Sequence, residues 1–445
     1  MSSKALPGFR DFYPEELAFR AHLFEAFRAV ARGYGFEEYD GPPLEPLELY
    51  TAKSGEEIVG QLYHFVDRGD RAVALRPEMT PTLARMVAAR ANGLRKPIRW
   101  FSIPQLFRYE RQQRGRLREH FQLNCDLIGE PGPGGDAEII ALAVDIMRRL
   151  GLGPTEVRVR LSDRRLLNAI LAGLGIPEAG QALAYQYLDK LGRGEEASRR
   201  QALVEAGVTA PQLEGLASLR RVQSWADIEA AFPAAAEVGQ PLREVLAVLE
   251  EMGLGDFLDL DLTIVRGLAY YTGTVFELFD AARSLRAICG GGRYDTLLQA
   301  VGGVDLPALG FGMGDVVLGE LLRERGLAPP VSAPIDLFVA AAAEADRPAV
   351  WRLVHELRDA GWRVEHALGV QNLGRQFKLA DARGARVALV VGADERARGA
   401  VVLKDLAAGG QREVARAALA AALEAALGPA PCRPLSTPSS PTAHG

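Results

Sequence analysis

The sequence predicts an α+β protein with two domains, and three observations support this. Helical and strand patterns are mixed over residues 15–161, as expected where helices pack on a sheet. Residues from about 163 to 242 keep only a helical period and are rich in Ala, Leu, Glu and Arg, which indicates a helical insertion. Strands and helices alternate after a proline-rich linker at 329–334, which is typical of an α/β domain. We therefore expect an interrupted domain over 1–328 and a second domain over 335–427.

The first domain begins with an amphipathic helix at 15–33, which Gly33 and Gly35 bring to an end. Two more helices are predicted, at 80–91 and 136–150. β-branched, aromatic or alternating residues predict strands at 36–39, 63–66, 72–75, 98–109, 119–129 and 155–161. Residues 67–70 would join the second and third of these strands as a hairpin. After the insertion, strand patterns resume at Leu262 and again at Arg286.

The second domain is predicted to alternate strands with helices. The expected strands lie at 335–341, 363–366, 387–391 and 400–404, and the expected helices at 345–361, 372–383 and 411–427. This order is that of βαβ units. The tail at 428–445 is rich in Pro, Ser and Thr, and we expect it to be disordered.

Composition excludes several classes of protein. Hydrophobic residues make up 48% of the 445 residues, which is ordinary for a globular protein with more than one core. The net charge of −5 excludes a uniformly basic nucleic-acid coat, although a local basic patch can still bind phosphate. Three cysteines without CxxC or zinc spacing favour a reducing compartment. Because no signal core and no membrane-spanning stretch is apparent in the sequence, we expect a cytoplasmic protein.

Two neighbouring runs, 266–277 and 289–295, carry the strongest signal of a site. They combine one fixed cation, Arg266, with tyrosines that include Tyr271 and Tyr294, beside a cluster of glycines. Glycines allow a ligand or a second backbone to approach closely. The runs therefore predict two strands whose polar face lines a binding site.

An arginine-rich loop follows the strand at 98–109. Arg108 stands at the end of that strand, where a guanidinium can be held rigidly for bidentate binding of a phosphate or carboxylate. The remaining arginines up to Arg118 suit a polyanion that approaches from solvent. The alternative is a solvated hairpin tip held by salt bridges.

Glu78 and Thr80 lie between the strand at 72–75 and the helix at 80–91. Thr80 could cap this helix, with Pro81 in its first turn, and then its role would be structural. Glu78 has no such role and is a candidate partner for an ammonium ligand.

A polar stripe follows the strand at 119–129. Gln122, Asn124 and Asp126 share one face because side chains alternate along a strand. Such a stripe is either solvated or a binding floor, and taken alone it favours a solvated face. Cys125 would then be a small buried residue and not a nucleophile.

The glycine-rich segment 310–315 does not have the spacing of a dinucleotide loop, and no βαβ unit surrounds it. Four histidines lack metal-ligand spacing and are expected to be structural or exposed: His64, His120, His355 and His366.

Together and in this order, these motifs resemble those of the histidyl-tRNA synthetases, a family of class II aminoacyl-tRNA synthetases. The resemblance extends from Pro7 to about Leu427. Residues 35–43 resemble class II motif 1, residues 107–129 resemble motif 2, and residues 310–322 occupy the place of motif 3. The runs 266–277 and 290–295 resemble the histidine-specific signature, which is the most specific of these motifs.

The resemblance implies a class II catalytic domain, with an antiparallel sheet backed by helices, and a C-terminal α/β anticodon-binding domain. It implies that histidine and ATP give histidyl-adenylate and pyrophosphate, and that histidine then passes to the 3′ end of tRNA(His). ATP would bring Mg²⁺, whose ligands the motifs do not assign. A homodimer would form through motif 1.

The resemblance also implies roles for single residues. Arg108 and Arg266 would be catalytic, both reaching the α-phosphate of ATP, and Glu110 would lie near the adenine. Six residues would bind histidine, three at its amino group and three around its imidazole: Glu78, Thr80 and Gln122, then Asp126, Tyr271 and Tyr294. A neutral imidazole has one donor and one acceptor, which a carboxylate and phenols can read.

The resemblance implies contacts to tRNA from both domains. Four loop residues would face the acceptor end: Arg111, Gln113, Arg114 and Arg116. The helical insertion would clamp the acceptor arm, and the C-terminal domain would read the anticodon through residues 371–378.

Three positions depart from the common family pattern. Val317 stands where motif 3 usually has an arginine against ATP, Ala269 stands where many members have Asp, and Gln112 stands where Pro is common. The first two variants resemble a branch with plant and some bacterial members.

Two other classes of protein compete with this interpretation. One is the regulatory subunit of ATP phosphoribosyltransferase, a catalytically silent relative that binds histidine without tRNA. That class usually lacks an anticodon domain and loses catalytic residues, whereas residues 335–427, Arg108 and Arg266 are present here. The other is a scaffold protein with a class II core, which the intact polar residues disfavour.

Overall fold

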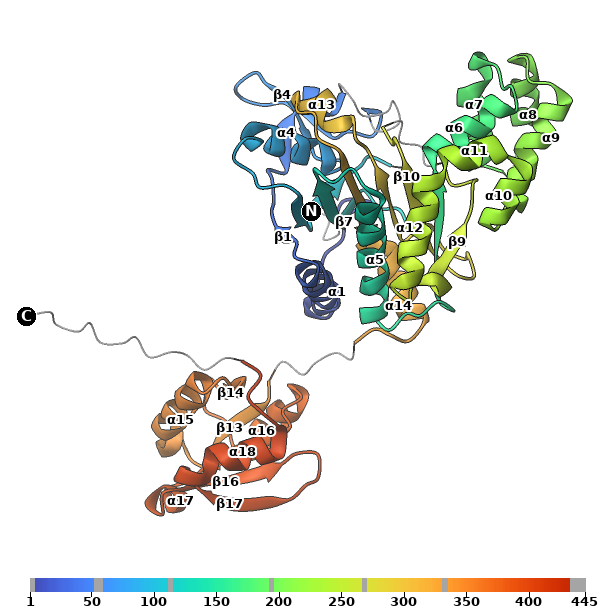
Figure 1. Cartoon of the computed structure of the whole chain (residues 1–445). Coiled ribbons are helices and arrows are strands. Elements are labelled where there is room, and N and C mark those ends of the chain that lie inside the picture. The colour runs from blue at the N-terminus through green and yellow to red at the C-terminus, as the bar shows by residue number, and fades with distance from the viewer. Residues whose placement is uncertain are drawn as a thin grey trace, which may run out of the picture. The chain divides into compact units, whose positions relative to one another are not determined.

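The computed structural model describes residues 5–51, 59–110, 115–191, 196–265, 270–329 and 335–432. The chain divides into two compact units, Met1–Pro329 and Pro330–Gly445 (Figure 1). Within the described ranges, no helix is both long and apolar enough to cross a membrane.

The first unit is built on a large sheet, which has nine strands when the described residues are counted. Eight strands lie side by side in the order β1 (Glu37–Glu38), β5 (Ile98–Ser102), β7 (Glu119–Ile128), β12 (Ala308–Gly314), β11 (Cys289–Arg293), β10 (Thr274–Asp280), β8 (Val157–Asp163) and β9 (Leu258–Leu260). The ninth, β6 (Gln105–Phe107), pairs with the first residues of β7. Pairing is antiparallel from β5 to β8 and parallel at the two edges. The expected antiparallel sheet is thus confirmed.

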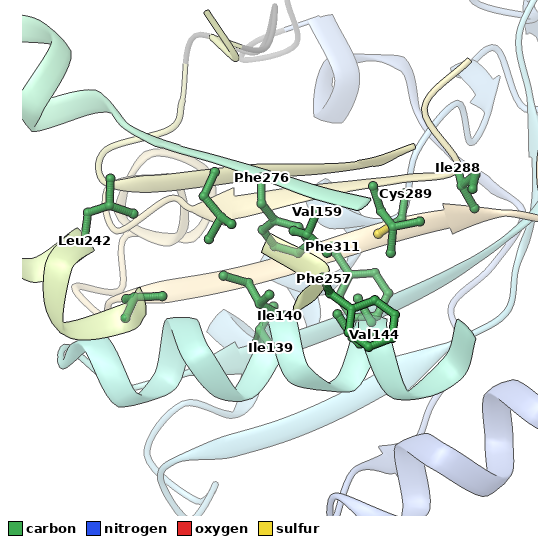
Figure 2. Packing of buried hydrophobic residues seen from close by; sticks show 14 of the residues in the cluster. Ile139, Ile140, Val144, Val159, Leu242, Phe257, Phe276, Ile288, Cys289 and Phe311 are labelled. Carbon is green, nitrogen blue, oxygen red and sulfur yellow. The ribbon is translucent and has the colours of Figure 1, made fainter. Parts of the chain in front are cut away.

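Long helices cover one face of this sheet and leave the other face for a site. They are α1 (Pro14–Gly33), α5 (Pro133–Arg149), α12 (Gln240–Glu251) and α14 (Asp315–Glu324). Figure 2 shows Ile140 and Val144 of α5 packed near Phe311 in the core behind the strands. α5 is apolar around most of its circumference because it lies between the sheet, α1 and α12.

The predicted helical insertion is present between β8 and α12. Its helices are α6 (Arg164–Gly173), α7 (Glu178–Asp189), α8 (Glu196–Glu205), α9 (Ala210–Ser218), α10 (Trp225–Ala231) and α11 (Pro233–Val238). The buried carboxylate of Asp163 starts α6 because it accepts hydrogen bonds from the backbone N–H groups of Arg165 and Leu166. α7 to α10 lie together in Figure 1, whereas α12 returns to pack on α5. The helical run therefore continues past residue 242, to Glu251.

A smaller layer lies near the N-terminal part of the sheet. Its three strands lie in the order β2 (Leu44–Pro46), β4 (Ala72–Leu75) and β3 (His64–Val66), beside α2 (Leu47–Thr51). α4 (Thr80–Arg90) follows β4 and packs against α13 (Leu297–Gly302), which comes soon after β11. This contact holds α4 beside the segment that follows β11.

The second unit has a five-stranded sheet, counted over its described residues. The strand order is β14 (Val364–His366), β13 (Leu337–Ala341), β15 (Val387–Val391), β16 (Ala400–Asp405) and β17 (Gln411–Ala415). α15 (Arg347–Asp359) and α18 (Leu419–Leu427) pack on one face with Leu337 and Val339, and α16 (Leu373–Ala382) packs on the other with Phe338. Burial on both faces explains why β13 is a continuous apolar run. The short helix α17 (Ala393–Ala397) precedes β16.

Several predicted elements differ from the structure. The strand at 98–109 is divided into β5 and β6 because Pro104 lacks the N–H that a central strand must donate. β10 begins only at Thr274, so Tyr270 to Gly273 lie outside the strand that was expected over 266–277. The helix expected at 411–427 is wrong in its first half, because residues 411–415 pair with β16 as β17. Strand pairing across the hairpin outweighed the local helical pattern.

Candidate functional site

The open face of the large sheet is hollowed along its two central strands. Glycines of these strands, β12 and β11, pair with one another across the sheet: Gly310 with Gly292, and Gly312 with Gly290. Side chains of neighbouring elements fill the space that these residues leave. A Cβ added at Gly310 would stand 2.5 Å from Oδ1 of Asp126. The glycines are therefore required so that side chains can lie flat over the sheet.

One end of this depression holds a buried polar pair. The Tyr294 hydroxyl donates a hydrogen bond to Oδ1 of Asp126, and both side chains are almost completely buried. The ring of Tyr271 lies over Gly292, whose added Cβ would stand 2.9 Å from Cδ1 of that ring. Asp126 comes from β7, whereas Tyr294 follows β11, so the sheet brings together residues far apart in the sequence.

Asn124 and Asp126 of the polar stripe on β7 are buried, so the solvated face that the stripe alone favours is wrong. Burial raises the pKa of Asp126 to about 7, and the hydrogen bond from Tyr294 partly opposes this rise. Burial, and after it the charge of Asp126, holds the pKa of Tyr294 well above its usual value, so this phenol stays protonated. Cys125 packs behind the sheet, as predicted.

Glu78 and Thr80 lie at the start of α4, a helix whose buried apolar residues pack in one cluster with Tyr271 and Tyr294. Glu78 is buried. Nε of Arg108 donates a hydrogen bond of 2.9 Å to the carbonyl of Pro77, which brings the end of β6 against the same turn. Thr80 does not cap the helix, because Met79 is the N-cap residue and no side-chain cap forms. Pro81 does lie in the first turn.

A cavity of about 1640 Å³ lies over the other end of the depression. Its walls come from the residues around the arginine-rich loop, from the sheet, from the first turn of α14 and from the insertion. Four predicted site residues line it: Arg108, Glu110, Arg116 and Gln122. Asp126, Tyr271 and Tyr294 do not line it, and they form the buried end of the same floor. Gln122 connects the two regions, because it shares a face of β7 with Asp126.

Glu110 stands between two arginines in this cavity. Its Oε2 lies 2.9 Å from Nε of Arg116, and its Oε1 lies 4.0 Å from Nη1 of Arg108. Arg116 therefore lines the cavity instead of pointing only to solvent. The other predicted residues of this region lie outside the described residues: Arg111, Gln113, Arg114 and Arg266, with the departures Gln112 and Ala269.

A buried ionic network fixes the strand that carries Gln122 and Asp126. Arg10 reaches Glu119 at the start of β7 through Nε at 2.6 Å, and Asp315 at the start of α14 through Nη1 at 2.9 Å. Asp315 also accepts a hydrogen bond of 2.9 Å from the backbone N–H of Phe121. The network ties the N-terminal segment, β7 and α14 together beneath the cavity.

The structure adds cavity residues that the sequence interpretation missed. They are His120, Arg160, Asp261, Glu277, Arg283, Arg286, Arg220 and Arg221. Two of them had a signal in the sequence: His120 lies two residues before Gln122 on the same face of β7, and Glu277 lies in the run 266–277. Burial, and after it the charges of Arg108 and Arg10, lowers the pKa of His120 to about 3, so the ring is neutral. The prediction that His120 is structural or exposed therefore left out its place in the cavity wall.

Arg160 and Glu277 lie on adjacent strands, and their positions pair directly across β8 and β10. Nη1 of Arg160 lies 3.2 Å from Asp261. Within the described part of the chain, no group of three or more His, Cys, Asp or Glu side chains could hold a metal ion.

The second unit presents a separate small depression. Arg347, Trp351 and Gln371 line it, and the Arg347 guanidinium lies 5.1 Å from the centre of the Trp351 ring. Trp351 is 48% exposed, whereas Gln376 is 3% exposed and bonds to the backbone of Ala341. Within the contact segment expected at 371–378, Gln376 is therefore structural.

A family model described as histidyl-tRNA synthetase matches residues 8–314, and one described as an anticodon binding domain matches residues 336–426. The chain is 45% identical over 420 residues to histidine–tRNA ligase of Opitutus terrae, covering 93% of this chain and 96% of that one. It is 41% identical to the chloroplastic/mitochondrial histidine–tRNA ligase of Arabidopsis thaliana, covering 92% and 84%. The crystal structure of histidyl-tRNA synthetase from Nostoc sp. PCC 7120 superposes with a TM-score of 0.82 at 27% identity, covering 96% and 100%.

Proposed function

Because this chain belongs to the histidyl-tRNA synthetase family, we propose that it activates histidine with ATP and transfers the histidyl group to tRNA(His). One observation carries the proposal on structural grounds. A large cavity with many arginines in its walls adjoins, through Gln122, the buried pair of Asp126 and Tyr294. A triphosphate suits the first region, and an imidazole suits the second.

In the first step, a carboxylate oxygen of histidine attacks the α-phosphorus of ATP. A new O–P bond forms, the bond between the α-phosphorus and the bridging oxygen to the β-phosphate breaks, and pyrophosphate leaves with the electron pair. Arg108 can stabilise the charge that develops, because its Nε bond to Pro77 fixes a guanidinium that lines the cavity. Arg266 is the proposed second cation at the α-phosphate, on its place in the signature run.

Histidine would bind across the depression of the sheet. Glu78 and Gln122, with Thr80, would hold its ammonium group at the cavity end. Asp126 would accept the imidazole N–H, while Tyr271 and Tyr294 would border the ring. A site that pairs both imidazole nitrogens rejects amino acids that leave its buried polar groups unpaired.

ATP would lie in the cavity with its adenine near Glu110, whose carboxylate can accept hydrogen bonds from the adenine amino group. Mg²⁺ would enter with ATP as part of the substrate. It binds through phosphate oxygens, water and one or two carboxylates, and Glu277 is a carboxylate in the cavity wall.

In the second step, the ribose hydroxyl at the 3′ end of tRNA attacks the carbonyl carbon of the adenylate, and AMP leaves. Arg116 would guide the acceptor end toward the cavity. The family resemblance adds three loop residues to this role: Arg111, Gln113 and Arg114. Arg220 and Arg221 would extend this surface from the insertion. The second unit would bind the anticodon, with Trp351 as an exposed surface on which a base can stack.

We further propose that the protein acts as a cytoplasmic homodimer. The dimer rests on the motif 1 resemblance of residues 35–43, and the compartment rests on the sparse, unpaired cysteines.

Histidine-dependent exchange between pyrophosphate and ATP, followed by charging of tRNA(His), tests the proposal. Exchange should require histidine, and none of the other common amino acids should replace it. Absence of exchange in the folded protein would refute the enzyme, and exchange without charging would refute the tRNA step. The regulatory-subunit alternative expects histidine binding with neither activity.

A further inference from the structure

We propose that Arg286 binds the terminal phosphates of ATP and supplies the positive charge that position 317 lacks. The inference rests on the proposed function, because it assigns one more residue to the nucleotide end of the same cavity. Arg286 and Val317 both line that cavity, from two different elements. Arg286 lies just before β11, and Val317 lies in the first turn of α14.

The two side chains meet at one point. A Cβ added at Gly115 would lie 3.3 Å from Cγ2 of Val317 and 3.7 Å from Cδ of Arg286. Gly115 has a positive φ of 74° and lies within the arginine-rich loop, so all three residues border one wall of the cavity. The stem of Arg286 therefore extends toward the place that a longer side chain at position 317 would occupy.

The backbone before Arg286 is held firmly. The buried carboxylate of Asp280 accepts hydrogen bonds from the backbone N–H groups of Ser284 and Leu285 and from the Ser284 hydroxyl. The N–H of Ile288 then bonds to the carbonyl of Leu278 at 2.8 Å. These bonds fix the connection between β10 and β11 on both sides of Arg286, so its side chain starts from a defined position.

Charge in the cavity favours a phosphate at this wall. Arg108 lines the cavity from the end of β6 and Arg286 from the connection before β11, so two different elements offer a cation to the triphosphate. Arg116 and Arg160 also line the cavity, where they lie against Glu110 and Asp261. The first turn of α14 also lines the cavity near Val317, and its backbone N–H groups add partial positive charge. Arg286 supplies the full charge on this side.

The test removes the positive charge at position 286 and then restores a positive charge at position 317. ATP–pyrophosphate exchange is measured for the wild type, Arg286→Ala, and the double variant Arg286→Ala/Val317→Arg, with Arg325→Ala as control. Arg325 is an exposed arginine at the far end of α14 and lies outside the cavity lining. Arg286→Ala should raise the KM for ATP roughly 10- to 100-fold, the loss of a charge-assisted hydrogen bond, and change the KM for histidine less than about twofold.

The double variant should recover at least part of the ATP affinity, because an arginine from α14 reaches the same wall. Arg325→Ala should behave as the wild type. The inference is overturned if Arg286→Ala leaves the KM for ATP unchanged, if both KM values rise equally, or if a folded double variant shows no recovery. Absence of exchange in the wild type would instead refute the proposed function, so the two failures are distinguishable.

Discussion

At the scale of single residues, Asp126 combines burial with a specific polar partner. Desolvation favours its neutral form, whereas binding an imidazole N–H requires the carboxylate. The protein keeps this carboxyl within reach of ionisation near neutral pH because the Tyr294 hydroxyl donates to it. A buried group of this kind is typical of a functional site.

Asp126 should therefore make histidine use depend on pH. Its pKa of about 7 in the folded protein lies above the value of about 4 for an unfolded Asp. Protonation thus favours the folded state: the stabilisation is complete below about pH 4 and is lost as pH rises through about 7. Histidine use should change in the opposite sense and rise through pH 7, as the carboxylate forms.

The measurement is kcat/KM for histidine against pH in wild type and in Asp126→Asn. The wild type should show two ionisations, that of Asp126 and that of free histidine at about 6.5. The variant should keep only the second and should lose roughly 10- to 100-fold in kcat/KM for histidine. The same profile in both proteins would rule out a role for Asp126 in reading the imidazole, and the KM for ATP serves as control.

Arg266 tests the proposed transition-state contact at the α-phosphate. Arg266→Ala should lower kcat for adenylate formation by roughly 100- to 1000-fold, as removal of a charge-stabilising donor does. Adenylate formation is followed in a single turnover, with circular dichroism as the check on folding. Arg325→Ala again provides the matched loss of an exposed arginine, and near-normal turnover in Arg266→Ala would contradict the assignment.

At the scale of elements, β11 and β12 are unusual strands because their glycines face the site. Arg293 holds β11 against the start of α5, since its buried guanidinium lies 2.6 Å from Asp136 and bonds to the carbonyls of Glu130 and Gly132. Such multiple bonds compensate for the flexibility that glycine gives a strand.

Two neighbouring glycines of β12 should respond differently to alanine. A Cβ at Gly310 would stand 2.5 Å from the carbonyl oxygen of Cys125, which the sheet holds in place. Gly310→Ala should therefore destabilise the first unit by about 1–3 kcal/mol. A Cβ at Gly312 would meet the amide of Gln122 at 2.7 Å, and that amide can move.

Gly312→Ala should accordingly keep nearly the wild-type Tm but raise the KM for histidine severalfold, because it displaces Gln122. Thermal unfolding and exchange kinetics of both variants check this contrast. A large loss of Tm in Gly312→Ala, or an unchanged KM for histidine, would count against Gln122 lying over this glycine as a histidine ligand.

At the scale of the whole molecule, the two units have separate cores. The apolar clusters of the second unit involve β13 to β17 and its own helices, and those of the first unit involve the large sheet. Each unit should therefore fold without the other.

A chain that ends at Pro329 should separate the two steps of the reaction. Histidine-dependent exchange should stay within about threefold of the full-length protein, because the proposed substrate groups lie in the first unit. Charging at limiting tRNA should fall roughly 100-fold or more, as expected when one of two linked binding sites is lost. Equal loss of both activities would argue that the second unit supports the catalytic unit directly.

The sequence alone determined most elements of this protein and most types of residue at its site. Periodicity is a local property, so it placed α1, α5 and β7 and separated the helical insertion from the sheet. Strand ends and glycines also identified Arg108, Tyr271 and Tyr294 as candidates, whereas Asp126 became a candidate through the family resemblance, because its polar stripe alone favoured a solvated face. Periodicity did not find that residues 411–415 form a strand, since their pairing with β16 is a contact between segments.

Only the tertiary structure decided which residues share one site. Asp126 and Tyr294 are 168 residues apart in the sequence. They meet because a single strand, β12, separates β7, which carries Asp126, from β11, which Tyr294 directly follows. The sequence assigned Arg286 no role in a site and marked it only as the start of an expected strand, whereas β11 begins at Cys289. Its place beside Val317 follows from the pairing of β10 with β11 and from the start of α14. Local patterns encode each element, but proximity across a sheet is set by strand order, which no local pattern contains.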